Sequence, residues 1–420
     1  MAEIKPASTP PGAASRFTPY QKVVAGLLAF LQFAVIIDFM VMAPLGALIM
    51  PPLKIAPARF GMVVSAYAFS AGISGLLAAG FADRFDRKKL LLFFYVGFLG
   101  GTLWCALAQS FESLLAARIV TGLFGGVIGS VLIAIASDLF APQLRGRAMG
   151  IIQTAFSASQ VLGLPTALYL SNRWDWHAPF FMIAAVGVLG GLVVAWRLKP
   201  VDAHLATQRD ASAVGHLLRT VTDKRHHAAF AATALLTTGG FMLMPFSSVF
   251  TVNNLGISVA QLPTIYLVTG LCTIFAGPLI GKAADRFGKL PVFFAGSVLT
   301  VVMVTIYTHL GPVPLALVIV VNVVMFAGIF SRIIPYQAMS ASVPELHMRG
   351  AFSAISASIQ QLSGGVAAIV AGHLVSTGAD GKLHGFANVG YVVIGSTAVA
   401  AFLVMHVQKG ISRREAAGAS

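Results

Sequence analysis

Charged residues are scarce in this sequence: Asp, Glu, Lys and Arg together make up 10% of its 420 residues. A water-soluble domain carries about 25% charged residues, whereas 57% of this chain is hydrophobic. So few ionic groups do not cover the surface of a soluble globule of this size. The composition therefore excludes a cytosolic enzyme and a disordered chain, and it requires a lipid bilayer as the solvent.

Cysteine is equally scarce, because the chain holds two, Cys105 and Cys272, each inside an apolar run. Two buried thiols do not make the framework of a secreted disulfide scaffold. The sequence has no His-x-x-x-His pair that suggests a metal site, no phosphate-binding loop and no catalytic set. We therefore expect neither an enzyme nor a bound cofactor or metal, and transport driven by ATP is disfavoured.

Long apolar runs are what the sequence does have, and a membrane-spanning helix needs about 20 such residues. The first run is too long for the core of a signal peptide, so we expect a retained tail before it. A charged, His-rich segment at 198–226 separates six runs from six. The runs lie at 23–50, 60–82, 90–109, 112–137, 147–170, 177–197, 227–252, 260–281, 290–309, 314–338, 351–374 and 386–407.

These runs predict an all-α membrane protein with twelve transmembrane helices in two six-helix bundles. The expected organisation is a cytoplasmic tail at 1–22, a first bundle at 23–197, a cytoplasmic linker at 198–226, a second bundle at 227–408 and a cytoplasmic tail at 409–420. We expect a monomer.

The net charge of +14 is explained by topology rather than by nucleic-acid binding. With the amino terminus inside, twenty-two Lys and Arg residues fall in inner segments, four fall in outer loops, and Arg118 and Arg332 lie within spans. Positive charge gathers on the cytoplasmic side of membrane proteins. The sequence therefore predicts a multi-pass protein of the cytoplasmic (inner) membrane with both termini in the cytoplasm, and no nucleic-acid partner.

The two halves of the chain repeat each other in the same order, which predicts two related bundles. Because both halves start on the same side, an axis along the membrane normal relates them, and such symmetry is typical of transporters whose halves rock around a shared site. The paired segments are 38–44 with 240–245, 82–88 with 284–289, 145–146 with 349–350, and the Ser-Ala-Ser at 157–159 with that at 356–358.

On these residues the sequence resembles the major facilitator superfamily, in particular its twelve-helix drug/proton antiporters and the arabinose-efflux-permease-like proteins. Asp83-Arg84-Phe85-Asp86-Arg87-Lys88 is similar to the family's loop motif, with Ala79 and Asp86 where the family has glycines. Arg118, Gly122 and Gly126 resemble its span-4 antiporter motif, and the segment 159–165 is a degraded form of its span-5 motif. The resemblance implies a proton-coupled carrier.

Asp38 is the carboxylate that lies deep in a span, roughly 22 Å from the start of the first helix. A charged group at that depth costs several kcal/mol and is a functional candidate by default. Because burial disfavours the charged form, Asp38 is suited to take up and release a proton, or to bind a cationic substrate. The alternative is a permanently paired structural carboxylate.

Arg118 lies roughly 9 Å inside the outer end of the fourth span, within reach of the first. A nearby guanidinium favours an ionised carboxylate and so opposes the effect of burial. In the resembled family an arginine here influences the protonation of an acid in span 1. The alternative is an arginine that extends to the lipid headgroups.

Polar side chains form one face in the fifth span and one in the eleventh, and in lipid such a face turns toward protein or water. We expect the two faces to line a substrate cavity, although they also suit simple helix–helix adhesion. Arg332 either lines that cavity or extends to the membrane surface. The candidate cavity residues are Tyr67, Gln153, Ser157, Gln160, Arg332, Tyr336, Gln337, Ser356, Gln360 and Ser363.

The loop motif after the second span is a candidate conformational gate. The carboxylate of Asp83 is suited to the exposed N–H groups that begin another helix, and the resemblance points to the start of span 11. By the same resemblance Arg87 pairs with Asp138. Alternatively, the basic residues serve topology alone. The gating set is Asp83, Arg84, Arg87 and Asp138, with Asp285 and Arg286 in the repeated copy.

Together these features predict a secondary transporter that exports a small organic compound by proton antiport, with protons, the substrate and the bilayer as partners. The expected substrate is neutral or cationic, because Asp38 is the one deep acid. Two alternatives remain open: a proton-coupled importer of a sugar or other small solute, and a membrane receptor that transports nothing.

Overall fold

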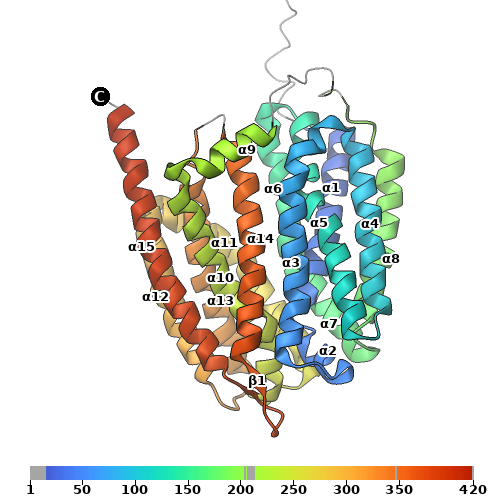
Figure 1. The fold of residues 1–420 in the computed structure, drawn as a ribbon, viewed down its shortest axis with the longest axis vertical. Helices are drawn as coiled ribbons and strands as arrows, with labels where there is room; N and C mark the ends of the chain where they lie inside the picture. The colour runs from blue at the N-terminus through green and yellow to red at the C-terminus, as the bar shows by residue number, and fades with distance from the viewer. Residues whose placement is uncertain (1–15, 203–204, 206–212, 346–347, 419–420) are drawn as a thin grey trace, which may run out of the picture.

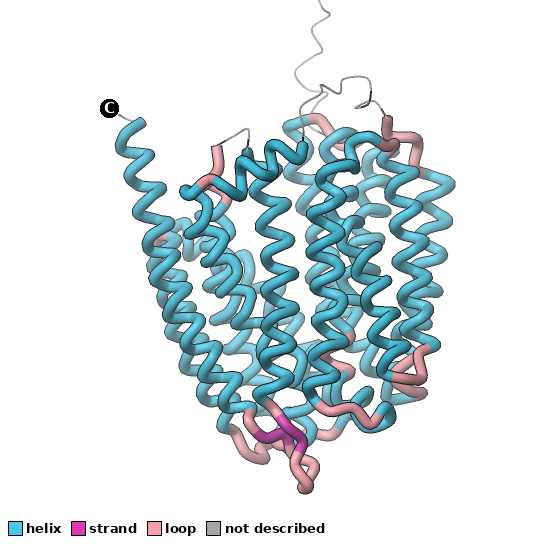
Figure 2. The backbone as a smooth tube through the Cα atoms, viewed as in Figure 1, coloured by secondary structure: helices cyan, strands magenta, loops and turns pink. Residues whose placement is uncertain are grey.

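The computed structural model describes residues 16–202, 205, 213–345 and 348–418, and helices make up most of that chain (Figure 2). The expected amino-terminal tail lies outside the described residues up to residue 15. Within the linker, the same is true of residues 203–204 and 206–212. The statements below concern the described part.

The helices of the first half follow the expected spans with small shifts at their ends. They are α1 (Pro19–Val41), α2 (Gly46–Leu53), α3 (Pro57–Phe81), the short η2 (Ala82–Arg84), α4 (Arg87–Leu107), α5 (Phe111–Leu139), α6 (Pro142–Ala158), the π-helical η3 (Ser159–Gly163), α7 (Leu164–Arg173) and α8 (Ala178–Arg197).

The second half begins with a short helix inside the linker. It contains α9 (Ala213–Thr222), α10 (Lys224–Asn253), the short η5 (Val259–Gln261), α11 (Leu262–Phe287), α12 (Lys289–His309), α13 (Leu315–Ser340), α14 (Arg349–Leu374), the strands β1 (Ser376–Thr377) and β2 (Leu383–His384), and α15 (Phe386–Gly418).

Eleven helices of the described chain are long and apolar enough to cross a membrane. The remaining expected span, 147–170, corresponds to α6, η3 and α7, which follow one another directly along the chain. A π-helical turn at Ser159–Gly163 separates the two α-helical pieces, so neither piece has the length of a membrane span. Single-turn π-segments inside α-helices often lie at functional sites.

The first span differs from the expected single helix over 23–50, because α1 ends at Val41 and α2 begins at Gly46. Pro44 explains the break: it has no N–H to donate, and its ring clashes with the carbonyl four residues earlier in a continuous helix. The single-helix expectation is therefore wrong at its end, and Asp38 lies in the last turns of α1.

Helix α9 and the carboxyl end of α15 lie at one end of the molecule, which we call the α9 end (Figure 1). The opposite end carries the antiparallel pair β1–β2, with Ser376 opposite His384, and we call it the hairpin end (Figure 1). Helices α3, α4, α5 and α8 lie on one side of the molecule in Figure 1, and α10, α12, α13 and α15 lie on the other.

The largest hydrophobic core contains buried residues from both halves of the chain, among them Phe60 of α3 and Phe246 of α10, whose ring centroids are 6.1 Å apart. Near the hairpin end, Ser248 donates a hydrogen bond to the Ala43 carbonyl (3.1 Å), and Asn172 donates one to the Val259 carbonyl (3.1 Å). The halves are therefore packed together at this end. Among the described residues, a separate core belongs to the first half, and the buried members of two smaller cores belong to the second, one of which also packs against Leu76 of α3.

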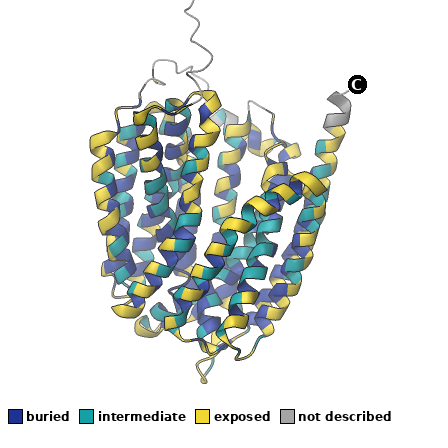
Figure 3. Cartoon of the chain, turned by 180° about the vertical axis from the view of Figure 1, so that it is seen from behind, coloured by how far each residue is buried: buried dark blue, intermediate teal, exposed yellow. Residues whose placement is uncertain are grey.

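Large apolar side chains are exposed on many of the helices. Figure 3 shows exposed residues, in yellow, along the outer helices. Phe93, Phe275 and Phe402 each expose 65% or more of their surface. An apolar exterior of this extent is unfavourable in water and is suited to lipid chains. The chain is therefore a multi-pass membrane protein.

Candidate functional site

The expected pair of membrane charges forms a direct ion pair between α1 and α5. Nη1 of Arg118 lies 2.8 Å from Oδ2 of Asp38 and 3.3 Å from the backbone oxygen of the same residue. Thr102 of α4 donates a hydrogen bond of 3.0 Å to the other carboxylate oxygen, Oδ1. The side chains of Asp38 and Arg118 are 0% and 1% exposed. Residues of two helices, α4 and α5, thus hold both oxygens of this α1 carboxylate in a fully buried site.

Tyr67 of α3 covers the ion pair on one side. The guanidinium carbon of Arg118 lies 4.5 Å from the centroid of the Tyr67 ring, a cation–π arrangement. Phe39 lies 5.2 Å from Tyr67 and 5.8 Å from Phe241 of α10, measured between ring centroids. A chain of aromatic rings therefore connects the ion pair to the second half of the chain.

Glycines on α5 allow it to pack closely against α3, and this close packing places Arg118 beside Tyr67. A Cβ atom added to Gly122 would collide with the backbone of Tyr67, and one added to Gly126 would collide with the backbone of Ala71. Small residues at this spacing allow two membrane helices to approach closely. The Arg118-x-x-x-Gly122-x-x-x-Gly126 pattern is thus a packing face with an arginine at one end.

The polar face of the fifth span reaches the second half through η3. Gln160 is buried, and its side-chain oxygen accepts a hydrogen bond of 3.3 Å from Thr273 of α11. A Cβ added to Gly270 would lie 3.0 Å from the Gln160 carbonyl oxygen, so the two helices touch here. Gln153 is exposed and Ser157 is half-buried.

The polar face of the eleventh span lies on α14, which packs along α3 rather than against α6. Gly61 and Gly72 of α3 lie close to α14 residues 368 and 361–362 respectively. Ser356 is buried, and no described residue provides a hydrogen-bond partner for its hydroxyl. Gln360 is exposed and Ser363 is half-buried. In this structure Gln160 lies against α11. The α14 residues that approach Gly61 and Gly72 of α3 are not members of the predicted polar face, and a cavity lined by both faces stays a prediction.

The polar group predicted on α13 is divided between two environments. The Tyr336 hydroxyl is buried and lies 2.8 Å from the hydroxyl of Thr233 on α10, whereas Gln337 is exposed. Arg332 is 3% exposed, and its Nε and Nη2 atoms have no hydrogen-bond partner among the described residues. It does not extend to the surface in this structure.

Arg87 is the centre of the loop motif. Its side chain bonds Asp83 (2.6 Å), Asp138 at the end of α5 (3.3 Å) and the Ala82 carbonyl (3.1 Å). Asp86, which stands where the family has glycine, accepts a hydrogen bond of 2.7 Å from the Lys88 N–H and caps the start of α4. The loop is therefore tied to α4 and α5 of its own half.

The other expected gate residues lie at the surface. The Asp83 side chain is 62% exposed and bonds Arg87, and a Cβ on Gly350 at the start of α14 would meet nothing within 4 Å. Docking of Asp83 onto α14 stays a prediction about another arrangement of the halves. Arg84, Asp285 and Arg286 are exposed, and Arg286 lies over the ring of Phe287 at 5.3 Å.

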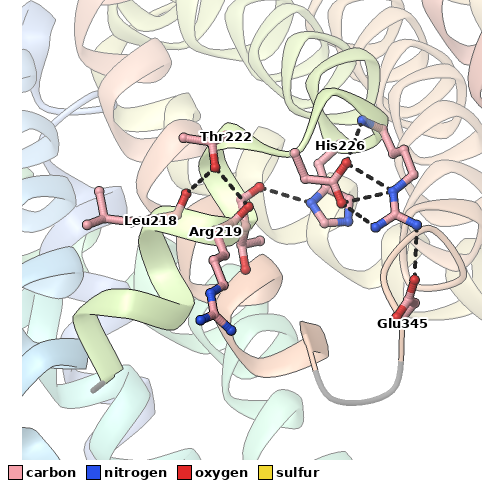
Figure 4. A network of polar contacts seen from close by, with 8 residues as sticks. Leu218, Arg219, Thr222, His226 and Glu345 are labelled. Atoms are coloured by element: carbon pink, nitrogen blue, oxygen red, sulfur yellow. Dashed lines mark hydrogen bonds and ion pairs between the residues drawn. The ribbon is translucent and has the colours of Figure 1, made fainter. Parts of the chain in front are cut away.

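A polar network at the α9 end connects the linker helix to α10 (Figure 4). Thr222 bonds the carbonyls of Leu218 and Arg219, and His226 Nδ1 lies 2.9 Å from the Thr220 carbonyl. Arg225 pairs with Asp223 (2.6 Å) and with Glu345 before α14 (3.0 Å). The hydrogen-bonded Arg225 guanidinium lowers the pKa of Asp223 to about 2.

Sequence reasoning found Asp38 and Arg118 because a charge inside an apolar run stands out. It missed Thr102, since one threonine in an apolar helix gives no distinguishing pattern. The neighbourhood of Tyr67 and Phe39 also depends on how the helices pack. A helical bundle of apolar exterior with a buried ion pair between two of its helices is typical of membrane transporters.

Comparison with known proteins identifies the family. The model of the Major Facilitator Superfamily matches residues 28–368 and 229–415. An uncharacterized MFS-type transporter of Bacillus subtilis, YceJ, is 26% identical over 388 residues, which cover 91% of this chain and 94% of the relative. A chloramphenicol efflux pump of Mycobacterium tuberculosis is 25% identical over 248 residues, 59% of each chain. The chain belongs to the Major Facilitator Superfamily, whose members are transporters and not enzymes.

The fold agrees with that family. A bacterial homologue of the human lysosomal transporter Spinster, in an inward-facing and occupied conformation, superposes with a TM-score of 0.70 at 16% identity. The match covers 94% of this chain and 96% of that one. The nucleoside transporter NupG superposes with a TM-score of 0.73 at 17% identity over 92% of this chain and 99% of that one.

Proposed function

We propose that this protein exports a small organic compound in exchange for protons. The observation that carries the proposal is the buried ion pair of Asp38 and Arg118, held by α1, α4 and α5 far from bulk water. A carboxylate in such a position is expensive to maintain, and proton relays in membrane carriers are built from groups of this kind. In the proposed cycle this paired arrangement corresponds to the ionised, proton-free form of the switch.

Protonation of Asp38 removes the negative charge that pairs with Arg118. When Asp38 takes up a proton it loses its charge, and Arg118 is left as a buried cation without its partner, which is strongly unfavourable. Relief requires that α5 move relative to α1 or that water reach the guanidinium. Proton binding is thereby coupled to a rearrangement of helices, which is the requirement for proton-driven transport.

The proposed architecture has twelve spans, with α6, η3 and α7 forming the fifth, in two six-helix bundles at 23–197 and 227–408 joined by the linker at 198–226. The α9 end faces the cytoplasm and both termini lie there. The excess of Lys and Arg in the loops at this end supports that orientation.

The arrangement proposed for this structure is open toward the cytoplasm. Three findings support this: the halves share one core near the hairpin end, the side chain of Asp83 is exposed, and Gly350 faces open space. In the opposite state Asp83 docks at the start of α14, while Arg87 and Asp138 keep the loop in register. The Asp285 and Arg286 copy serves the same role in the second half.

Export rather than import is the proposed direction. Two curated relatives carry efflux in their names: the chloramphenicol efflux pump, and a probable sugar efflux transporter of Helicobacter pylori that is 27% identical over 143 residues, 34% of this chain. The proposed cavity is lined by the polar residues of the fifth, tenth and eleventh spans together with Tyr67.

Flux into everted membrane vesicles tests the proposal, with chloramphenicol, xylose and benzoate as probes. Export by antiport predicts that at least one probe accumulates when the vesicle interior is acidic, and that a protonophore abolishes the accumulation. Asp38→Asn should abolish it too, whereas Asp175→Asn, at a surface carboxylate that is 60% exposed, should not. Full pH-driven flux in Asp38→Asn contradicts the coupling role. Uptake driven by an alkaline interior identifies an importer, and no flux of any probe identifies a receptor.

A further inference from the structure

Arg332 is a buried cation without a counter-ion. It is 3% exposed, and neither its Nε nor its Nη2 atom has a hydrogen-bond partner among the described residues. Buried charges in proteins are normally paired or hydrogen-bonded, since burial removes the water that solvates them. An arginine stays charged under all physiological conditions, so it cannot escape this cost by losing its proton.

The surrounding helices do not supply the missing negative charge. The sequences of α10, α12, α13 and α14 contain no Asp or Glu, and the acids of α11 and α15 are Asp285 and Glu415, close to the ends of their helices. Asp38 is not available either, because Arg118 and Thr102 already hold both of its carboxylate oxygens. The membrane interior of the described chain thus contains two guanidinium groups and one carboxylate.

On the side of its Nη1 atom, Arg332 faces a glycine of α10 and a serine of α15. A Cβ added to Gly239 of α10 would lie 3.8 Å from Nη1 of Arg332 and 3.9 Å from the hydroxyl oxygen of Ser396 on α15. The wall beside Nη1 therefore carries no side chain at Gly239, and the Ser396 hydroxyl next to it donates a hydrogen bond of 2.9 Å to the Val393 carbonyl. A Cβ on the following residue, Gly240, would meet no atom within 4 Å.

The internal repeat shows at which position the two halves differ in charge. Gly240 occupies the position of Asp38 when the segments 38–44 and 240–245 are aligned. The first half thus has an acid at this position and an arginine that neutralises it. In the described part of the second half, a glycine faces open space and Arg332 has no carboxylate paired with it.

We propose that Arg332 binds an anionic group of the transported molecule, a carboxylate in the first instance, beside Gly239 and Ser396. This inference rests on the proposed transport function and names its substrate class. A guanidinium binds a carboxylate through charge-assisted N–H···O bonds, and Nε and Nη2 of Arg332 have no partner among the described residues. The expectation of a neutral or cationic substrate was based on Asp38 as the one deep acid, and in this structure Arg118 and Thr102 hold both of its carboxylate oxygens.

Thermal unfolding of the purified full-length protein tests the inference without requiring transport. The probes are three acids and the amides that match them in shape: benzoate and benzamide, 1-naphthoate and 1-naphthamide, indole-3-acetate and indole-3-acetamide. We expect at least one acid to raise the Tm of the wild type more than its amide does. In Arg332→Gln the affinity for that acid should fall about tenfold or more, because a charge-assisted hydrogen bond is lost.

Two variants separate a site from general attraction to a basic protein. Lys409→Gln removes an exposed positive charge from α15, the helix that carries Ser396, and should leave the acid-induced shift unchanged. Arg332→Lys keeps the charge but not the paired donors, so it should bind the acid more weakly than the wild type and more tightly than Arg332→Gln. The inference is overturned if the amides match the acids, if the acid shift persists in Arg332→Gln, or if none of the three acids shifts the Tm.

The unliganded protein provides a second readout. If Arg332 is retained for binding, removing its unpaired charge should raise the Tm of the empty Arg332→Gln protein, whereas an arginine that holds the fold together would lower it. Failure of transport is distinguishable from failure of this site. An acid shift that depends on Arg332, without proton-driven flux, refutes the antiport proposal alone. Proton-driven flux of chloramphenicol with no acid shift refutes the anion site alone.

Discussion

Arg118 holds Asp38 through both its carboxylate and its backbone: Nη1 lies 2.8 Å from Oδ2 and 3.3 Å from the carbonyl oxygen of the same residue. Because Arg118 bonds both the carboxylate and the backbone of Asp38, its contacts depend on the position of α1 as well as on the charge of Asp38. Any shift of α1 along α5 lengthens both contacts together, which makes the pair sensitive to the arrangement of the first half.

The ion pair should show strong coupling in a double-mutant cycle. Arg118→Gln leaves Asp38 as a buried carboxylate without its cation, and we expect it to destabilise the protein by about 3–5 kcal/mol. Asp38→Asn combined with Arg118→Gln should recover part of that loss, because neither charge then remains unpaired. Unfolding in detergent measures the three variants, and additive losses would show that the two residues do not interact.

The close approach of α3 and α5 should make Gly126 intolerant of the smallest side chain. Gly126→Ala drives a Cβ into the Ala71 backbone, so we expect a loss of about 1–3 kcal/mol. Gly129→Ala on the same helix is the matched control, since its Cβ would meet one atom, Gln32 Oε1, at 3.9 Å. The two variants should differ clearly in Tm. Equal Tm values would mean that the helices are not in contact here.

A disulfide between the halves at the hairpin end should stop transport. A Cβ on Gly372 of α14 would lie 3.1 Å from Cα of Ala58 on α3, so Ala58→Cys and Gly372→Cys place two thiols on backbones in direct contact across the halves. If the halves must separate here during the cycle, oxidation abolishes flux and a reductant restores it. The control pair, Thr300→Cys and Gly328→Cys, joins α12 to α13 within the second half and should leave flux intact. Undiminished flux in the oxidised Ala58–Gly372 pair would argue against separation at this end.

Arg87 and Asp83 should contribute unequally to the free energy of unfolding. The Arg87 side chain is 8% exposed, and Arg87→Gln is expected to cost about 1–3 kcal/mol, since charge-assisted hydrogen bonds to two carboxylates are lost. Asp83 is 62% exposed, so Asp83→Asn should cost less than about 1 kcal/mol in unfolding experiments. A larger loss for Asp83→Asn than for Arg87→Gln would contradict the observed burial.

The pair at the start of α10 should weaken in acid. Because the hydrogen-bonded Arg225 lowers the pKa of Asp223 to about 2, the contribution of this group is present above the ordinary Asp pKa of about 3.9 and is lost as the pH falls from there through about 2. The difference in Tm between wild type and Asp223→Asn should shrink across that range. Asp175→Asn, at another surface carboxylate, is the comparison, and an Asp223 difference that stays constant with pH would exclude the linkage.

Much of the fold could be predicted from the sequence, since apolar runs of membrane length have few other structures available. The ends of the helices followed local chemistry that is visible in retrospect: Pro44 ends α1, and Asp86 caps α4. The π-helical turn at Ser159–Gly163 and the helix α9 inside the linker were not predicted. Their conformation depends on the helices packed against them.

The candidate site, too, was predictable from the sequence only in part. Single charges inside apolar runs located Asp38, Arg118 and Arg332, since their cost in lipid requires an explanation. Which of these charges have partners could not be read from spacing, because pairing is decided by the packing of different helices. The polar faces of the fifth and eleventh spans were visible as patterns, but the contact of Gln160 with α11 depends on how the helices pack.

The core that both halves share near the hairpin end has an energetic consequence. Opening that end must break apolar contacts such as the one between Phe60 and Phe246, whereas opening the α9 end breaks none belonging to that core. An empty carrier should therefore rest with its hairpin end shut. Binding of substrate or proton must then supply the free energy that separates the two halves at this end. The packing of this core therefore slows the conformational change of a carrier that has bound nothing.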